Sequence, residues 1–154
     1  MSTQCSTNPR IPVAEPRRHE QGIVDTSVVI DLGQIDPTDL PRDLAISAVT
    51  LAELAAGPHA TTDADERARR QDRLQRAEAA FEPLPIDAAV ARAYGRVYAT
   101  VTAAGRKARG RRALDLLIAA TAVAAELPLY TRNPDDFAEL GGLVDVVPVP
   151  VRAV

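Results

Sequence analysis

The sequence predicts an α/β domain organised around a central parallel sheet. Short apolar runs alternate along the chain with helical patterns, which is the order expected of consecutive parallel β/α units. Acidic or hydroxyl residues follow several of these runs directly, at the carboxyl ends where open α/β sheets bind their ligands. The expected strands lie at 22–24, 44–47, 129–131 and 144–149, with a further strand or extended connector at 81–86.

Two of these segments contain proline. Pro83 and Pro85 interrupt segment 81–86, and Pro148 interrupts segment 144–149. Because proline cannot donate a hydrogen bond to a neighbouring strand, both segments are predicted to lie at an edge of the sheet if they pair at all.

Length and composition are those of one globular domain with an aliphatic core. The chain has 154 residues, of which 46% are hydrophobic and only 3% aromatic, so its helices must pack through Leu, Val, Ile and Ala. The net charge of −3 argues against a non-specific cationic nucleic-acid-binding protein, although not against an enzyme that acts on nucleic acid. The single cysteine, Cys5, cannot form an internal disulfide, and no apolar run approaches the roughly 18 residues of a membrane span. These features predict a cytoplasmic protein without a membrane anchor.

The first 21 residues differ from the rest of the chain. They hold three prolines and only two sizeable apolar side chains, Ile11 and Val13. This composition predicts a disordered leader at 1–21, followed by one domain at 22–150. Removal of residues 1–20 is expected to change the free energy of unfolding by less than about 0.5 kcal/mol.

Helical patterns separate the expected strands. A short helix to about Leu32 follows the first strand, and segment 50–56 predicts a helix that Gly57 and Pro58 close. Residues 63–80 carry acid-then-base pairs four residues apart, which is typical of a solvated helix. These pairs are Asp63–Arg67, Asp65–Arg69, Glu66–Arg70 and Asp72–Arg76.

Two longer helices are expected in the second half of the chain. Asp87 is a candidate N-cap for a helix that ends at Gly105, with an apolar stripe from Val90 to Ala104. Segment 114–125 is apolar nearly all round and therefore predicts a buried helix.

Four acids occupy corresponding places in this pattern. Asp25 ends the first strand, Glu53 lies one turn inside the helix after the second, Asp115 lies in the first turn of the buried helix, and Asp136 follows strand 129–131. Taken singly, these acids have ordinary explanations. Asp25 could be no more than a helix cap, and Glu53 could be a surface glutamate. Together, they are expected to converge at the carboxyl edge of the sheet.

Carboxylates gathered in this way raise one another's pKa values and oppose folding unless a cation neutralises them. Oxygen ligands suit Mg²⁺ or Mn²⁺, whereas zinc favours His or Cys. Both histidines, His19 and His59, lie outside the cluster, and the sequence has no glycine-rich phosphate loop. The combination predicts metal-assisted hydrolysis of a phosphodiester.

Four segments carry a resemblance to a known family. They are VDTSV at 24–28, TLAEL at 50–54, DLLIAATA at 115–122 and TRNPDDF at 131–137. In this order and spacing they resemble PIN-domain ribonucleases, and more narrowly the VapC-type toxins of bacterial toxin–antitoxin pairs. The resemblance implies a three-layer α/β/α PIN-like fold around a parallel sheet. It also implies an Mg²⁺-dependent endoribonuclease toxin that cleaves cellular RNA and forms a homodimer.

The resemblance implies roles for individual residues. Asp25 and Asp115 match the principal metal ligands, for Mg²⁺ or Mn²⁺, and Glu53 matches a third acid. Asp136 matches a fourth place that is commonly acidic. The expected catalytic set is therefore these four residues.

Supporting roles are expected for four further residues, Thr26, Arg112, Asn133 and Asp135. Asn133 stands where some relatives have an aspartate, and Asp135 could take the place of Asp136. Thr26 could bond a carboxylate or a phosphate, and Arg112 could contact RNA.

A cognate VapB-like antitoxin is the implied partner. Its inhibitory segment is expected to place an arginine among the acids, and apolar side chains along Leu51 and Leu54. One alternative function is a catalytically inactive PIN-like module that acts only through protein contacts. The basic run at 106–112 remains open between a phosphate contact and a solubilising loop.

Overall fold

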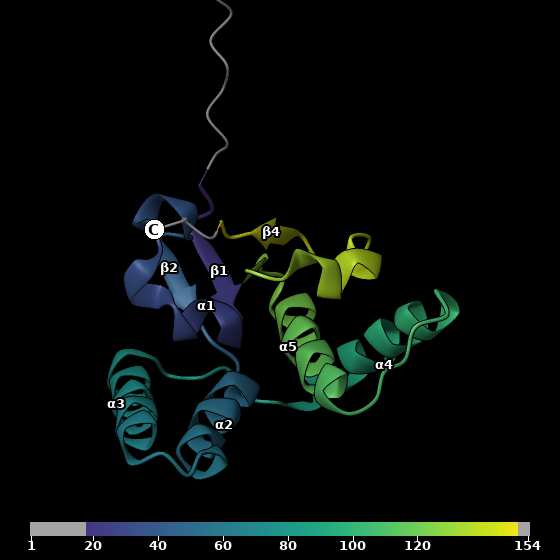
Figure 1. The fold of residues 1–154 in the computed structure, drawn as a ribbon. Helices are drawn as coiled ribbons and strands as arrows, with labels where there is room; N and C mark the ends of the chain where they lie inside the picture. Colours follow the sequence, from purple (N-terminus) through teal and green to yellow (C-terminus); the bar gives the residue numbers. More distant parts are fainter. Residues whose placement is uncertain (1–17, 151–154) are drawn as a thin grey trace, which may run out of the picture.

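A computed structural model describes residues 18–150, which contain a four-stranded parallel sheet. The strands are β1 (Gln21–Val24), β2 (Asp43–Ala45), β3 (Leu129–Thr131) and β4 (Val146–Pro148). Their spatial order is β2-β1-β3-β4, so β1 and β3 occupy the centre (Figure 1). The parallel α/β architecture predicted from the sequence is confirmed.

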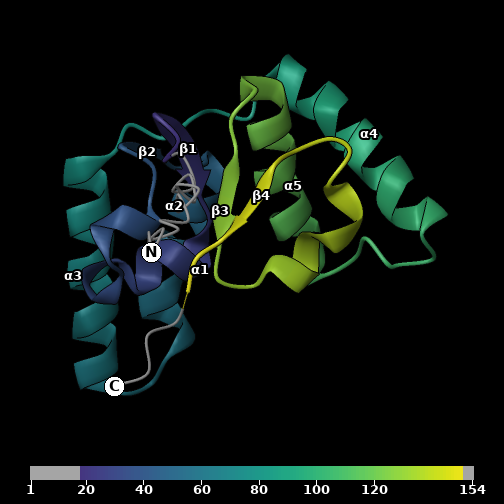
Figure 2. The same ribbon diagram turned by 90° about the horizontal axis from the view of Figure 1, so that it is seen from above.

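Helices cover both faces of the sheet (Figure 2). The α-helices are α1 (Thr26–Ile30), α2 (Ala48–Ala56), α3 (Ala64–Ala80), α4 (Ala88–Ala103) and α5 (Arg111–Ala125). Short 3₁₀-helices are η1 (Leu32–Gln34), η2 (Pro37–Asp39), η3 (Gly57–Ala60) and η4 (Pro134–Leu140).

The strands alternate between two hydrophobic cores. Ile23 and Leu129 point into a core shared with α4, α5 and η4, whereas their neighbours Val24 and Tyr130 point into a second core with α1 and α3. This alternation follows from the two-residue period of a strand, and it divides the domain into three layers. The three-layer arrangement expected from the sequence is therefore confirmed.

The α4–α5 pair is packed through small and branched side chains. Val97 and Val101 on α4 are fully buried, as are Leu116, Ile118 and Ala119 on α5. Most of the apolar stripe predicted for α4 is confirmed, but it ends at Val101, because Ala104 is an exposed C-cap. Asp87 caps α4 as predicted, since its Oδ1 accepts a hydrogen bond of 3.0 Å from the Val90 amide.

Two helix ends differ from the sequence-based expectation. Helix α5 begins at Arg111, so Asp115 lies beyond the first turn, and the positive end of the helix is not its direct neighbour. Gly57 ends α2 with φ −52° and leads into η3, rather than adopting the left-handed conformation of a glycine stop. Segment 81–86 contributes one parallel bridge, between Ser47 and Leu84, in keeping with its edge prediction.

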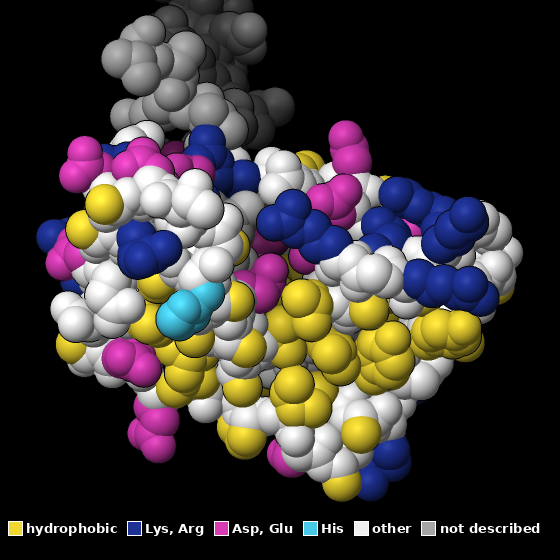
Figure 3. Space-filling view, turned by 60° about the horizontal axis from the view of Figure 1, so that its bottom comes forward, with side chains coloured by type: hydrophobic (Ala, Val, Ile, Leu, Met, Phe, Trp, Pro, Cys, Tyr) yellow, Lys and Arg dark blue, Asp and Glu magenta, His cyan; other side chains and the backbone are white. Residues whose placement is uncertain are grey.

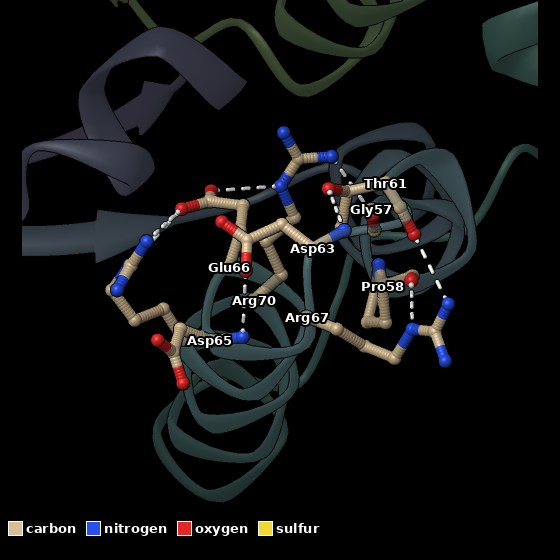
Figure 4. Close-up of polar contacts among 9 residues, drawn as sticks. Gly57, Pro58, Thr61, Asp63, Asp65, Glu66, Arg67 and Arg70 are labelled. Atoms are coloured by element: carbon tan, nitrogen blue, oxygen red, sulfur yellow. Dashed lines mark hydrogen bonds and ion pairs between the residues drawn. The ribbon is translucent and has the colours of Figure 1, made fainter.

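Helix α3 is tied to the end of α2 by its arginines (Figure 4). Arg67 Nε donates to the Pro58 carbonyl at 3.2 Å, and Arg70 Nη1 donates to the Gly57 carbonyl at 2.9 Å. Two predicted pairs form, Glu66–Arg70 at 2.9 Å and Asp72–Arg76 at 3.0 Å. The other two give way to alternatives, since Asp63 caps the helix and Arg69 pairs with Glu66. The polar face of α3 is therefore partly a docking surface for η3.

Residues 1–17 of the expected leader lie outside the described residues, and its extent remains a prediction. Its last residues contact the domain. Arg18 Nε donates to the Leu40 carbonyl at 2.7 Å, and the His19 ring packs edge-on against Tyr130. Over 18–150, no helix has both the length and the apolar character that crossing a membrane requires.

Candidate active site

The four acids predicted from the sequence interact at the carboxyl edge of the sheet. They come from separate elements: Asp25 from the end of β1, Glu53 from α2, Asp115 from α5 and Asp136 from η4. Burial, together with the charges of Glu53, Asp136 and Asp25, raises the pKa of Asp115 from 3.8 to about 6. The fold thus brings four carboxylates within electrostatic reach of one another.

Asp25 is both a helix cap and the most buried of these acids. Its side chain is 6% exposed. Its Oδ1 accepts hydrogen bonds from Ser27 Oγ at 2.5 Å and from the Val28 amide at 3.2 Å, while Thr131 Oγ1 donates to Oδ2 at 2.5 Å. Burial raises the pKa of Asp25, and these hydrogen bonds oppose that rise. The capping interpretation of Asp25 is therefore confirmed, and its role as a metal ligand stays a prediction.

Thr26 holds Glu53 in place. Thr26 Oγ1 lies 2.7 Å from Glu53 Oε1 and 3.1 Å from the buried hydroxyl of Thr50. The expectation that Thr26 bonds a carboxylate is met by Glu53. Because these hydrogen bonds link α1 to α2, they set the position of Glu53 relative to Asp25.

The end of β3 and the loop after it carry both buried and exposed side chains. Thr131 is fully buried, and its Oγ1 accepts a hydrogen bond of 3.0 Å from the Asn133 amide. The side chains of Asn133 and Asp135 are exposed, whereas Asp136 is half-buried and acts on Asp115. Asp136 is therefore the acid of this loop whose charge raises the pKa of Asp115. The roles expected of Asn133 and Asp135 stay predictions.

Arg112 faces a carboxylate of its own chain. Its Nη2 donates to Glu139 Oε1 at 2.6 Å, and its positive charge lowers the pKa of Asp115. The RNA contact expected of Arg112 stays a prediction. Sequence reasoning missed Glu139, together with the supporting hydroxyls of Ser27 and Thr131. The hydroxyls had a signal, because each lies within two residues of an acid or of a strand end.

The oxygen atoms of the four acids are the candidate ligands for a hard divalent cation. Among residues 18–150, no three His, Cys, Asp or Glu side chains already form a metal-ligating group. Mg²⁺ does not require one, since it usually keeps several waters and binds through one or two carboxylates. The acids supply only oxygen ligands, and a cation would relieve both the burial of the Asp115 charge and its repulsion by the other acids, which together raise its pKa. The residues therefore fit Mg²⁺ or Mn²⁺.

A cavity of about 580 Å³ adjoins the acids between α1, α2, α3 and the start of α5. Thr26 and Glu53 line one part of it, and Ile30 and Leu114, which are 44% and 40% exposed, line another. A space-filling view shows hydrophobic side chains gathered in a band, with Lys and Arg side chains along one border (Figure 3). The site thus combines an acidic pole with an apolar surface.

Comparison with known proteins places this geometry in a family. The sequence matches the PIN domain over residues 23–143. It is 40% identical over 128 residues to Ribonuclease VapC5 of Mycobacterium tuberculosis, covering 81% of this chain and 91% of that protein. It is 39% identical over 104 residues to Ribonuclease VapC8 of the same species, covering 66% and 89%.

A solved structure agrees with these matches. The crystal structure of VapBC-5, a toxin–antitoxin system of Mycobacterium tuberculosis, contains a chain that superposes with a TM-score of 0.73 at 39% identity, covering 86% of this chain and 99% of that one. The sheet order, the acids at its carboxyl edge and these similarities lead to one conclusion. This chain belongs to the PIN domain family and, within it, to the VapC ribonucleases.

Proposed function

We propose that this protein is a metal-dependent endoribonuclease toxin that hydrolyses phosphodiester bonds of cellular RNA. The observation that carries the proposal is the place of Asp115, which is partly buried beside three other acids; burial and these charges together raise its pKa to about 6. A carboxylate cluster of this kind is unfavourable for packing alone and suits a divalent cation. The names of the VapC5 and VapC8 relatives, both ribonucleases, support the same reaction.

Asp25 and Asp115 are the proposed ligands of Mg²⁺ or Mn²⁺, with Glu53 and Asp136 completing the catalytic set. When bound, the cation would stabilise charge on the phosphoryl oxygens and lower the pKa of an attacking water. The role of the protein is to fix the positions of the carboxylate oxygens before the cation and the substrate bind. Ser27 and Thr131 fix both oxygens of Asp25, and Thr26 engages one oxygen of Glu53. This arrangement reduces the reorganisation needed when substrate arrives.

RNA cleavage with Mg²⁺, with and without EDTA, tests this proposal. Cleavage should require the metal, and Asp25→Asn and Asp115→Asn should abolish it while the protein stays folded. Asp72→Asn is a matched control, because it removes a carboxylate from an exposed ion pair on α3. If wild-type protein cleaves no RNA with Mg²⁺ but binds its partner, the inactive binding-module alternative is correct. Full cleavage by both Asn variants would instead overturn the site assignment.

The proposed partner is a VapB-like antitoxin, in line with the toxin–antitoxin system whose structure this chain resembles. A segment that brings an arginine to Asp25 or Asp115 could form forked hydrogen bonds and compete with Mg²⁺. The expected apolar contact at Leu54 is wrong, because Leu54 is 5% exposed and belongs to the core. The large exposed apolar side chains of the cavity are Ile30 and Leu114, and these are the proposed anchors.

Calorimetric titration of the partner tests this mode of inhibition. The partner should bind wild type less tightly as Mg²⁺ rises, and should lose affinity for an Asp25→Ala, Asp115→Ala double variant. Ile30→Asp should weaken binding without changing RNA cleavage by the free toxin. Affinity that responds neither to Mg²⁺ nor to any of these substitutions would place the partner elsewhere.

A homodimer is proposed on the α4 surface. Tyr98 is 47% exposed and lies beside Tyr94, with ring centroids 6.2 Å apart, so an aromatic pair stands at the border of the core stripe. Burying such a pair between two copies would favour association. Light scattering of wild type and of Tyr98→Glu tests this, since the charged variant should be monomeric.

A further inference from the structure

A buried glutamate joins α5 and the loop before it to η4. Glu139 Oε1 accepts from Arg112 Nη2 at 2.6 Å and lies 3.0 Å from Arg106 Nε. The side chains of Glu139 and Arg112 are only 8% and 17% exposed. Arg106 Nη1 also donates to the Asp135 carbonyl at 3.4 Å. We call Arg106, Arg112 and Glu139 the Glu139 clamp.

The clamp lies one turn away from two of the acids. On α5, Arg112 precedes Asp115 by three residues, so both side chains lie on the same side of the helix. On η4, Glu139 follows Asp136 by three residues, and a 3₁₀-helix has three residues per turn, so these two side chains also share a face. The contact between Arg112 and Glu139 therefore links the helical turns next to Asp115 and Asp136.

Stability alone explains this ion pair poorly. Arg112 Nε and Glu139 Oε2 are buried, and neither has a hydrogen-bond partner. Such unsatisfied groups are costly, and a buried ion pair is often no more stabilising than apolar side chains of the same volume. A pair that is buried, incompletely satisfied and adjacent to a cluster of acids calls for a second explanation.

We propose that the Glu139 clamp is a positioning device that sets the separation between Asp115 and Asp136, and thereby the affinity of the acids for a divalent cation. The proposal rests on the proposed function, because it concerns the same four acids. Glu139 has a further effect on Arg112. It binds this guanidinium, whose positive charge lowers the pKa of Asp115, and so fixes where that charge lies relative to the acids. Arg112 and Glu139 are thus positioning residues rather than catalytic ones.

A double-mutant cycle tests the clamp. Glu139→Gln is made in wild type and in Asp136→Asn, and the dissociation constant of Mn²⁺ is measured from the free-ion paramagnetic resonance signal, without RNA. In the wild-type background, Glu139→Gln should weaken binding about tenfold, at the lower end of effects from residues that support metal ligands. In the Asp136→Asn background, the same change should weaken binding less than about twofold, since the acid that the clamp positions is already gone.

Two further variants separate positioning from folding. Asp72→Asn, which breaks an exposed ion pair of 3.0 Å on α3, should leave the dissociation constant unchanged. Glu139→Asp keeps the buried carboxylate but shortens its arm, so it should fold even if Glu139→Gln does not, and it should weaken Mn²⁺ binding. Thermal melting identifies any variant that has unfolded.

The outcomes are distinct. Equal losses of Mn²⁺ affinity in both backgrounds, or wild-type affinity in Glu139→Gln and Glu139→Asp, would overturn the clamp's role. If the wild-type protein binds Mn²⁺ but cleaves no RNA, the proposed function is wrong. The dissociation constants of the double-mutant cycle would still test the clamp. A wild-type protein that binds no Mn²⁺ would overturn both.

Discussion

Thr131 Oγ1 donates a hydrogen bond of 2.5 Å to Oδ2 of Asp25, and so joins the carboxyl ends of the neighbouring strands β3 and β1. Both side chains are buried. A hydrogen bond to a buried carboxylate is stronger than one between neutral groups, because the surroundings screen the charge weakly. The hydroxyl of Thr131 therefore supports both the sheet and the geometry of the acidic edge.

Replacement of Thr131 by valine should destabilise the protein and impair its activity. Valine has the same shape but lacks the donor to Asp25 and the acceptor for the Asn133 amide. We expect a loss of about 1–3 kcal/mol in the free energy of unfolding, measured by urea denaturation. Thr131→Ser keeps the hydroxyl and should retain most of the stability. Equal stability of the valine variant and wild type would show that the hydrogen bond contributes little.

Asp115→Asn should stabilise the metal-free protein near neutral pH. The folded-state pKa of Asp115, about 6, lies above the ordinary value of 3.8, so the folded protein binds this proton more tightly. The stability that Asp115 contributes is complete below pH 3.8 and is lost as the pH rises to about 6. Since Asp115 is partly exposed and screened by solvent, the loss should be about 1 kcal/mol.

Urea denaturation between pH 4 and 7 measures this effect. The difference in stability between Asp115→Asn and wild type should grow over that range in EDTA. Added Mg²⁺ should stabilise wild type and leave the variant unaffected. A difference that stays constant with pH would mean that Asp115 titrates normally.

Gly22→Ala should be strongly destabilising. A Cβ at this position of β1 would lie 2.7 Å from Cε2 and 2.9 Å from Cδ2 of Tyr130. The ring is buried and packed in the core, so relief of the clash would require movement of β3, at a cost of about 1–3 kcal/mol. Gly33→Ala is the matched control, because nothing lies within 4 Å of its Cβ. Melting temperatures of the two variants should differ by several degrees.

Two truncations test where the leader ends and the folded domain begins. Removal of residues 1–17 is expected to leave stability within about 0.5 kcal/mol of wild type, on sequence composition. Removal of residues 1–20 also deletes the Arg18 bond to Leu40 and the backbone bond of 2.8 Å from the Asp43 amide to the Glu20 carbonyl. These contacts revise the expectation from composition for residues 1–20, so the longer truncation should lower the melting temperature measurably. Identical melting of both proteins would show that residues 18–20 contribute nothing.

The sheet and the places of the acids could be predicted because each rests on a local pattern. Strands such as 22–24 and 129–131 are short apolar runs, and parallel pairing brings their ends to one edge. Asp25 follows the first run directly, and Asp136 lies in the turn after the second. The start of α5 at Arg111 was not predictable from the apolar pattern, because the helix begins with two arginines that precede the apolar residues.

Contacts between distant residues could not be read from the sequence. In the sequence, Glu139 looks like any other helical glutamate. Its ion pairs with Arg112 and Arg106 depend on how the segment before α5 and α5 itself pack against η4. Leu54 was expected at an exposed surface because the pattern of α2 does not show that α3 covers it, whereas the core contains Leu54 and Ala77 together. Pairwise geometry of this kind depends on how elements pack, which periodicity alone does not encode.

The pairing of Arg106 and Arg112 with Glu139 limits how the basic loop can respond to ionic strength. Segment 106–112 carries five cations, but two of them bind Glu139. Lys107, Arg109 and Arg111 are its other cations, and all three are exposed. Each phosphate contact to a single strand contributes about −0.7 to the slope of log affinity against log salt concentration. If RNA crosses this loop, the loop's share of that slope should therefore stay near −2, well below what its sequence alone would suggest.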